Sequence, residues 1–203
     1  MNLLGAGGPG RDEVPIFPLQ TVLFPGMRLP LRIFEPRYMD MAKACLKHDA
    51  AFGVCLIREG EEVGGPAVPE SVGCLARIAD WDMKQLGILA VRAEGGDRFR
   101  LVATRTTPAG LVVGEIERFA AESAAEPREL ADCAEFARKV IETVGTPRFA
   151  PPFHYDDASW VGFRLAEILP LRNDVRQRLL ELTDASGRLA VLHRFLKEQR
   201  LLG

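Results

Sequence analysis

The 203-residue sequence lacks the short motifs that mark common enzymes and metal sites. No Gly-Lys pair occurs, so the P-loop that cradles ATP phosphates is absent. No serine lies in a G-x-S-x-G elbow, and neither H-E-x-x-H nor C-x-x-C is found. From these absences we expect a protein that is not an enzyme and that has no catalytic residues, no metal site and no cofactor.

The sequence also lacks a charge surplus and a long hydrophobic run. It has 26 basic and 28 acidic residues, giving a formal net charge of -2, whereas nonspecific binding to phosphate backbones usually needs a basic excess. No apolar run reaches the roughly 20 residues that span a bilayer, and the N-terminus does not resemble a secretory signal. We expect a cytoplasmic protein that binds no membrane, and the charge argues against nucleic acid as a partner.

Cysteine is scarce, with four residues far apart in the sequence, namely Cys45, Cys55, Cys74 and Cys133. Cys55 and Cys74 lie in apolar runs, where a free thiol behaves as a small hydrophobic side chain. We interpret all four as reduced core residues, which suits a reducing cytosol.

Residues 1–13 are rich in glycine and polar residues and lack hydrophobic periodicity, which predicts a flexible N-terminal tail. The run GAGGPG at residues 5–10 matches the G-x-G-x-x-G dinucleotide pattern. That motif needs a strand before it and a helix after it, and the sequence predicts neither. We therefore assign the run to the tail.

Residues 14–119 form short extended segments broken by Gly and Pro, a spacing that favours a small barrel or sandwich. Tight turns at Lys84-Gln85 and at Gly95-Gly96-Asp97 predict two hairpins, over residues 73–94 and 86–106. The predicted strands cover residues 14–19, 28–34, 51–57, 73–83, 86–94, 98–106 and 111–119.

One helix interrupts these strands. Residues 35–48 place apolar side chains on one face, and Pro36 stands at the first helical position, where proline costs no hydrogen bond. We expect this amphipathic helix to pack on the barrel. Residues 59–71, with paired glycines and two prolines, predict a surface loop.

From residue 120 the periodicity becomes helical, which predicts a second domain over residues 120–203. Four helices are expected, over residues 130–144, 157–169, 173–183 and 186–201. Their predicted N-terminal caps are Asp157, Asn173 and Asp184, because such side chains accept the free N–H groups of a first helical turn. Four short helices predict a compact bundle.

Two groups of polar residues allow a chemical interpretation. His154 lies close in sequence to Asp156 and Asp157, which would suit a metal, but carboxylates at a helix N-terminus explain the same pattern and are favoured. A cryptic hydrolase would rest on Ser71 or Ser159, and the sequence identifies no base beside either serine. We rank the hydrolase last among the functions considered.

The segment from Val14 onward resembles the N-terminal, substrate-binding domain of the Lon protease. The resemblance rests on VPIFPL at residues 14–19, VLFPGMRLPLRIFEPRY at residues 22–38, FGV at residues 52–54, VGCLARI at residues 72–78, GDRFRL at residues 96–101 and the helical residues 157–171. It implies an α+β fold, in which a PUA-like β pseudo-barrel with one inserted helix precedes a C-terminal helical bundle.

The resemblance also implies recognition of unfolded or damaged polypeptide. In Lon the domain is followed by ATPase and peptidase modules, whereas this chain ends at Gly203, so we expect a stand-alone, non-enzymatic binding protein in protein quality control. A separate protease or chaperone that receives the client is a further candidate partner. The predicted peptide-binding residues are Phe24, Pro25, Met27, Phe34, Tyr38 and Trp81, because methionine and aromatic side chains adapt to varied apolar segments.

An alternative is an RNA or nucleotide-like ligand bound through the barrel, since similar barrels bind RNA. The balanced charge argues against it, and a steep loss of affinity with salt would support it.

Overall fold

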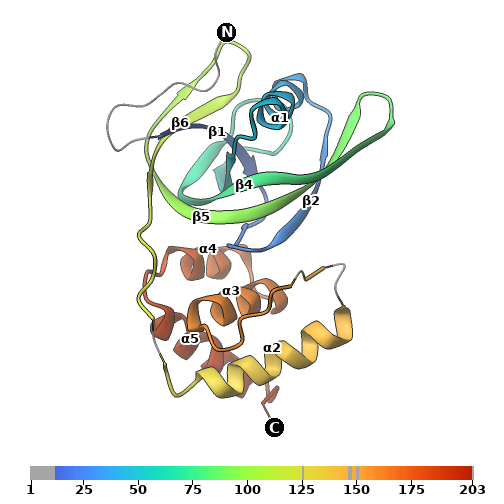
Figure 1. The fold of residues 1–203 in the computed structure, drawn as a ribbon. Helices are drawn as coiled ribbons and strands as arrows, with labels where there is room; N and C mark the ends of the chain where they lie inside the picture. Colours follow the sequence, from blue (N-terminus) through green and yellow to red (C-terminus); the bar gives the residue numbers. More distant parts are fainter. Residues whose placement is uncertain (1–11, 125, 146–147, 150, 203) are drawn as a thin grey trace. The chain divides into compact units, whose positions relative to one another are not determined.

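A computed structural model of the protein describes residues 12–124, 126–145, 148–149 and 151–202 (Figure 1). The chain divides into two compact units, one ending at Phe119 and the other beginning at Ala120. Most of the predicted tail, including the glycine run, lies outside the described residues. Its last two residues, Asp12 and Glu13, belong to the first strand.

Within the described residues, the N-terminal unit is one mixed sheet with a single helix, as the sequence predicted for the fold class. The sheet order is β2-β5-β4-β3-β1-β6, and β5 also pairs with β6, so five of the strands close into a ring (Figure 1). The elements are β1 (Asp12–Leu19), β2 (Arg28–Ile33), α1 (Pro36–His48), β3 (Phe52–Glu59), β4 (Val68–Gln85), β5 (Ile88–Thr106) and β6 (Val112–Arg118).

Strand β5 organises the ring because two strands share one of its edges. Residues 89–94 pair with β2, and residues 99–106 pair with β6. The opposite edge of β5 pairs with β4. The ring interior is filled by apolar side chains that alternate along the strands, including Ile16, Cys55, Leu75, Phe99 and Ile116.

The predicted hairpin over residues 86–106 is wrong, because Gly95 and Gly96 lie inside the continuous strand β5. Gly95 donates its N–H to the Met27 carbonyl at 2.9 Å and accepts the Gly26 N–H at 2.7 Å. A Cβ atom at position 95 would lie 2.2 Å from the Phe24 carbonyl oxygen. Glycine is needed here for close backbone approach and not for a turn.

The other predicted hairpin is present, with its turn two residues later than expected. Gln85 pairs with Ile88, so the loop consists of Leu86 and Gly87, and Gly87 adopts a positive φ of 82°. Leu86 is therefore an exposed turn residue instead of the first residue of a strand. Figure 1 shows this end of the β4–β5 hairpin extending past the neighbouring strands.

Among its described residues, the C-terminal unit contains four helices, in agreement with the sequence: α2 (Leu130–Val144), α3 (Ala158–Ile168), α4 (Asn173–Glu181) and α5 (Ala185–Glu198). Asp157 caps α3 by accepting the N–H groups of Ser159 and Trp160, and Asp184 caps α5 in the same way. Asn173 is not the cap predicted for α4, since Arg172 holds the cap position and Asn173 is already helical.

All four cysteines are free and buried, as the sequence predicted. Burial raises the pKa of the Cys45 thiol to about 11 and that of Cys133 to about 12, and it also raises the pKa of Cys55. A thiol with a pKa of about 11 is ionised in only about one molecule in 10³ at pH 8.

We therefore expect Ellman's reagent to leave the native protein almost unmodified at mildly alkaline pH. The four thiols should react together once guanidinium chloride is added. Rapid reaction of one thiol in the native protein would show that its burial is incomplete.

Within the described residues, no helix combines the length and the apolar character needed to cross a bilayer.

Candidate functional site

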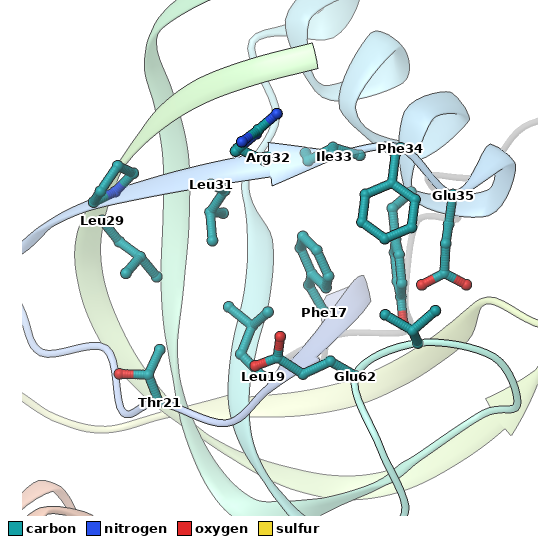
Figure 2. Close-up of a pocket in the computed structure, with 13 residues that line it drawn as sticks. Phe17, Leu19, Thr21, Leu29, Leu31, Arg32, Ile33, Phe34, Glu35 and Glu62 are labelled. Carbon is teal, nitrogen blue, oxygen red and sulfur yellow. The ribbon is translucent and has the colours of Figure 1, made fainter. Parts of the chain in front are cut away.

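A groove of about 340 Å³ lies in the N-terminal unit between β1 and β2, beside the start of α1 and the loop that joins β3 to β4 (Figure 2). Its lining is mainly apolar, with two carboxylates and one guanidinium. The lining residues are Phe17, Leu19, Thr21, Leu29, Pro30, Leu31, Arg32, Ile33, Phe34, Glu35, Tyr38, Glu62 and Val63.

The groove follows from the strand pairing. The pairing of β1 with β6 ends at Ile16, whereas its pairing with β3 continues to Leu19. Strand β2 occupies the part of the β5 edge that β6 does not reach. The sheet is therefore open between the last residues of β1 and the outer edge of β2, and the groove occupies this opening.

Alternation along β2 makes the groove apolar. Figure 2 shows Leu29 and Leu31 directed toward the side of the groove that carries Phe17 and Leu19, whereas Arg32 points the other way. Successive side chains of a strand point to opposite faces, so a strand of alternating character presents one kind of surface to the groove.

The α1 end of the groove is aromatic and acidic. Tyr38 stacks on Phe17 with ring centroids 4.1 Å apart. Burial raises the pKa of the Tyr38 hydroxyl, opposed by Arg37 and assisted by the carboxylates of Glu35 and Glu62. Glu35, Tyr38 and Glu62 all line this part of the groove.

Both carboxylates are held in place. Arg37 donates to Glu35 Oε2 at 2.9 Å and to the Gly110 carbonyl at 2.9 Å, which connects the start of α1 to the loop before β6. Glu62 accepts the Gln20 backbone N–H through Oε1. These contacts fix the walls at this end of the groove.

The six predicted peptide-binding residues fall in three different environments. Phe34 and Tyr38 line the groove, and Phe34 is 52% exposed whereas Tyr38 is buried. Phe24 and Met27 are buried, and Pro25 between them is partly buried. Trp81 is 56% exposed on β4, near the end of the β4–β5 hairpin, and does not line the groove.

Sequence reasoning missed several groove residues, notably Phe17, Leu19 and Val63. They come from β1 and from the loop between β3 and β4, and only the arrangement of the strands brings them to one groove with β2. One sequence signal could have located it. Pro30 stands inside a predicted strand, and proline in a strand indicates a sheet edge.

The residues behind the other chemical interpretations lie on β4, at the start of α3 and in the segment before α3. Ser71 is exposed on β4, and Ser159 donates its backbone N–H to the cap Asp157 at 2.8 Å. His154 packs edge-on against Trp160, with ring centroids 6.2 Å apart. In the described ranges, no three His, Cys, Asp or Glu side chains are grouped as a metal site would require.

The family model of the ATP-dependent protease La (LON) substrate-binding domain matches residues 13–198. The chain belongs to this family. A Lon N-terminal domain protein from Xanthomonas campestris has the same fold, with 37% sequence identity and a TM-score of 0.75 over 89% of this chain and 96% of that one. These matches confirm the predicted family and fold class and support a substrate-binding role.

A more distant solved structure shares the fold, and two curated proteins match in sequence. The N-terminal domain of Lon protease from the Mycobacterium avium complex is 20% identical, with a TM-score of 0.62 over 89% of this chain and 96% of that one. The Lon protease of Xanthomonas oryzae pv. oryzae is 27% identical over 89% of this chain and 22% of its own length. Protein cereblon of Xenopus tropicalis is 28% identical over 52% of this chain and 24% of its own length. The chain thus spans about a quarter or less of these two curated relatives.

Proposed function

We propose that the groove between β1 and β2 binds exposed hydrophobic segments of unfolded polypeptides, without ATP and without chemical change to the client. The observation that carries this proposal is an open, mainly apolar groove in a member of a substrate-binding family. The role proposed is protein quality control in the cytoplasm, with transfer of the client to a separate protease or chaperone.

The exposed apolar side chains of the groove support an apolar polypeptide segment as its ligand. Phe34 and Val63 are 52% and 55% exposed, so apolar surface remains in water until a ligand covers it. Covering it stabilises a complex by roughly 25 cal/mol for each Å² of apolar area removed from water. A site of this kind selects apolar character more than a defined sequence, as a protein that accepts varied unfolded clients requires. Contact by Trp81 remains a hypothesis, because it lies outside the groove.

Fluorescence anisotropy of the purified protein tests this function directly. The probes are a labelled, permanently unfolded polypeptide, the same polypeptide folded, and a short RNA, each at two salt concentrations and without ATP. The proposal expects selective, salt-tolerant binding to the unfolded chain. Binding to RNA alone, with affinity that falls steeply with salt, would transfer the function to nucleic acid.

Substitution of Phe34 by serine locates the binding surface. We expect Phe34→Ser to weaken binding of the unfolded polypeptide about tenfold, equivalent to about 1.4 kcal/mol. The melting temperature should change little, because the side chain is half exposed in the free protein. The measurements are anisotropy titration and thermal unfolding.

The matched control is Val102→Ser, which removes an exposed apolar side chain on β5 outside the groove. It should retain the affinity of the parent protein. Equal affinity for both variants would place the contact surface elsewhere.

A further inference from the structure

The open edge of β2 adds a specific feature to the groove. In the described part of the chain, β2 pairs with β5 and with no other strand. The outer edge of such a strand presents backbone N–H and C=O groups that can pair with another extended chain. Seven consecutive residues, 29–35, line the groove, so this edge runs along it.

The alternation of backbone hydrogen bonds between β2 and β5 shows which residues of β2 direct their N–H and C=O groups outward. The Met27 carbonyl accepts the Gly95 N–H, and the register continues from there with Leu29 opposite Ala93 and Leu31 opposite Val91. In an antiparallel pair, hydrogen-bonded positions alternate along the strand. The backbone N–H and C=O groups of the odd-numbered residues of β2 therefore point toward β5.

The even-numbered residues of β2 consequently direct their backbone groups away from β5. Pro30 fits this position, because it has no N–H to contribute to the β5 pairing. Arg32 directs both its N–H and its C=O outward. A chain added at this edge would hydrogen-bond chiefly to Arg32, with a further bond to the Pro30 carbonyl.

The side chains of such a chain would also follow from the register. Residues directly opposite each other in a sheet share a face. Client residues opposite Leu31 and Ile33 would lie on the groove side, against an apolar lining, whereas the one opposite Arg32 would lie on the other side. Glu35 and Glu62, at the α1 end, complement a basic residue there.

We propose that the groove accepts its client as an added antiparallel β-strand, paired with the outer edge of β2 through Arg32, and that it selects segments in which a basic residue precedes alternating apolar residues. The inference rests on the proposed function, and it names the substrate class: extended segments with a two-residue apolar period. An amphipathic helix has its backbone groups paired internally and could not make this contact.

Backbone methylation of a model peptide tests the pairing. The probe is a labelled peptide that begins with lysine and continues with alternating valine and threonine, in three forms: unmodified, N-methylated at the threonines, and N-methylated at the valines. Threonine takes the position opposite Arg32, so its methylation should weaken binding about tenfold. Valine methylation should leave the affinity within about twofold, because those amides face away from β2.

A matched pair of protein variants tests the same contact from the other side. Arg32→Pro removes the outward N–H, whereas Arg32→Ala removes only the side chain and retains that N–H. Arg32→Pro should weaken binding of the unmodified peptide about tenfold more than Arg32→Ala does. Thermal unfolding of both variants shows whether the edge strand is intact, and the methylated peptides decide the matter if Arg32→Pro does not fold.

The outcomes separate the two proposals. If the unmodified peptide binds and both methylated forms bind equally well or equally badly, one-sided pairing with β2 is wrong, while polypeptide binding stands. If neither the unmodified peptide nor the unfolded polypeptide binds, the proposed function itself fails and the strand addition fails with it.

Discussion

Replacing Arg188 with methionine should lower the free energy of unfolding of the C-terminal unit by about 3–5 kcal/mol. Arg188 is fully buried on α5, and its guanidinium forms an ion pair with the nearly buried carboxylate of Glu122. Nη1 donates to Glu122 Oε2 at 3.0 Å, Nε donates to the Leu179 carbonyl at 3.1 Å, and Nη2 donates to the Leu182 carbonyl at 2.6 Å. The loss is large because methionine leaves a buried carboxylate without its counter-charge.

Packing around the guanidinium makes the site specific for arginine. Its central carbon lies 3.9 Å from the centre of the Phe163 ring, and Gly162 leaves room for the arginine stem, since a Cβ there would lie 3.0 Å from Arg188 Cδ. Lysine could not donate to Glu122 and to two carbonyls from one plane. Arg188→Lys should therefore recover little of the lost stability.

Urea unfolding followed by circular dichroism measures this effect, with Arg194→Met as the control. Arg194 lies on the same helix but is exposed, so its replacement should change stability by less than about 0.5 kcal/mol. Adding Glu122→Gln to Arg188→Met should restore part of the loss, because the unpaired charge is removed. A double variant as unstable as Arg188→Met alone would attribute the loss to packing instead.

Alanine at position 95 should destabilise the N-terminal unit by about 1–3 kcal/mol, the cost typical of an added group with no space. Its Cβ would lie 2.2 Å from the Phe24 carbonyl oxygen and 3.1 Å from the carbonyl carbon. Both are backbone atoms, so a side-chain rotation cannot relieve the clash. The strand would have to move, and the two hydrogen bonds between Gly95 and residues 26 and 27 would weaken.

The adjacent glycine provides the control. A Cβ at Gly96 would lie 3.7 Å from the Leu75 carbonyl oxygen, an ordinary contact distance. Gly96→Ala should leave the midpoint of urea unfolding nearly unchanged, whereas Gly95→Ala should lower it. Equal effects of the two substitutions would mean that Gly95 owes its role to something other than close approach.

Local sequence signals predicted most of the elements but not all of their connections. Asp157 and Asp184 were recognisable as caps because capping depends only on the few residues around them. Gly95 was misinterpreted because a glycine that makes a turn and one that admits a neighbouring backbone look alike in sequence. The difference lies in Phe24, which is remote along the chain.

The candidate site was predictable only in part for the same reason. Phe34 and Tyr38 belong to the segment that carries the family resemblance, and both line the groove. Phe24 and Met27 have the same apolar character but lie buried beside β2. Composition cannot distinguish these two pairs, because the distinction depends on which strand edge remains open.

The pairing of β1 with β6 also has a consequence for the order of synthesis. Asp12 lies opposite Ile116, so β1 cannot complete the ring until β6, the last strand of the described N-terminal unit, has been synthesised. Contacts so distant in sequence form slowly, because a long chain must be restrained before they are made. Before residues Val112–Arg118 emerge from the ribosome, β1 lacks its β6 partner. The groove wall that β1 contributes is then not held in place from that side. The proposed client binding therefore requires the completed N-terminal unit, and we expect it to be absent from intermediates that lack β6.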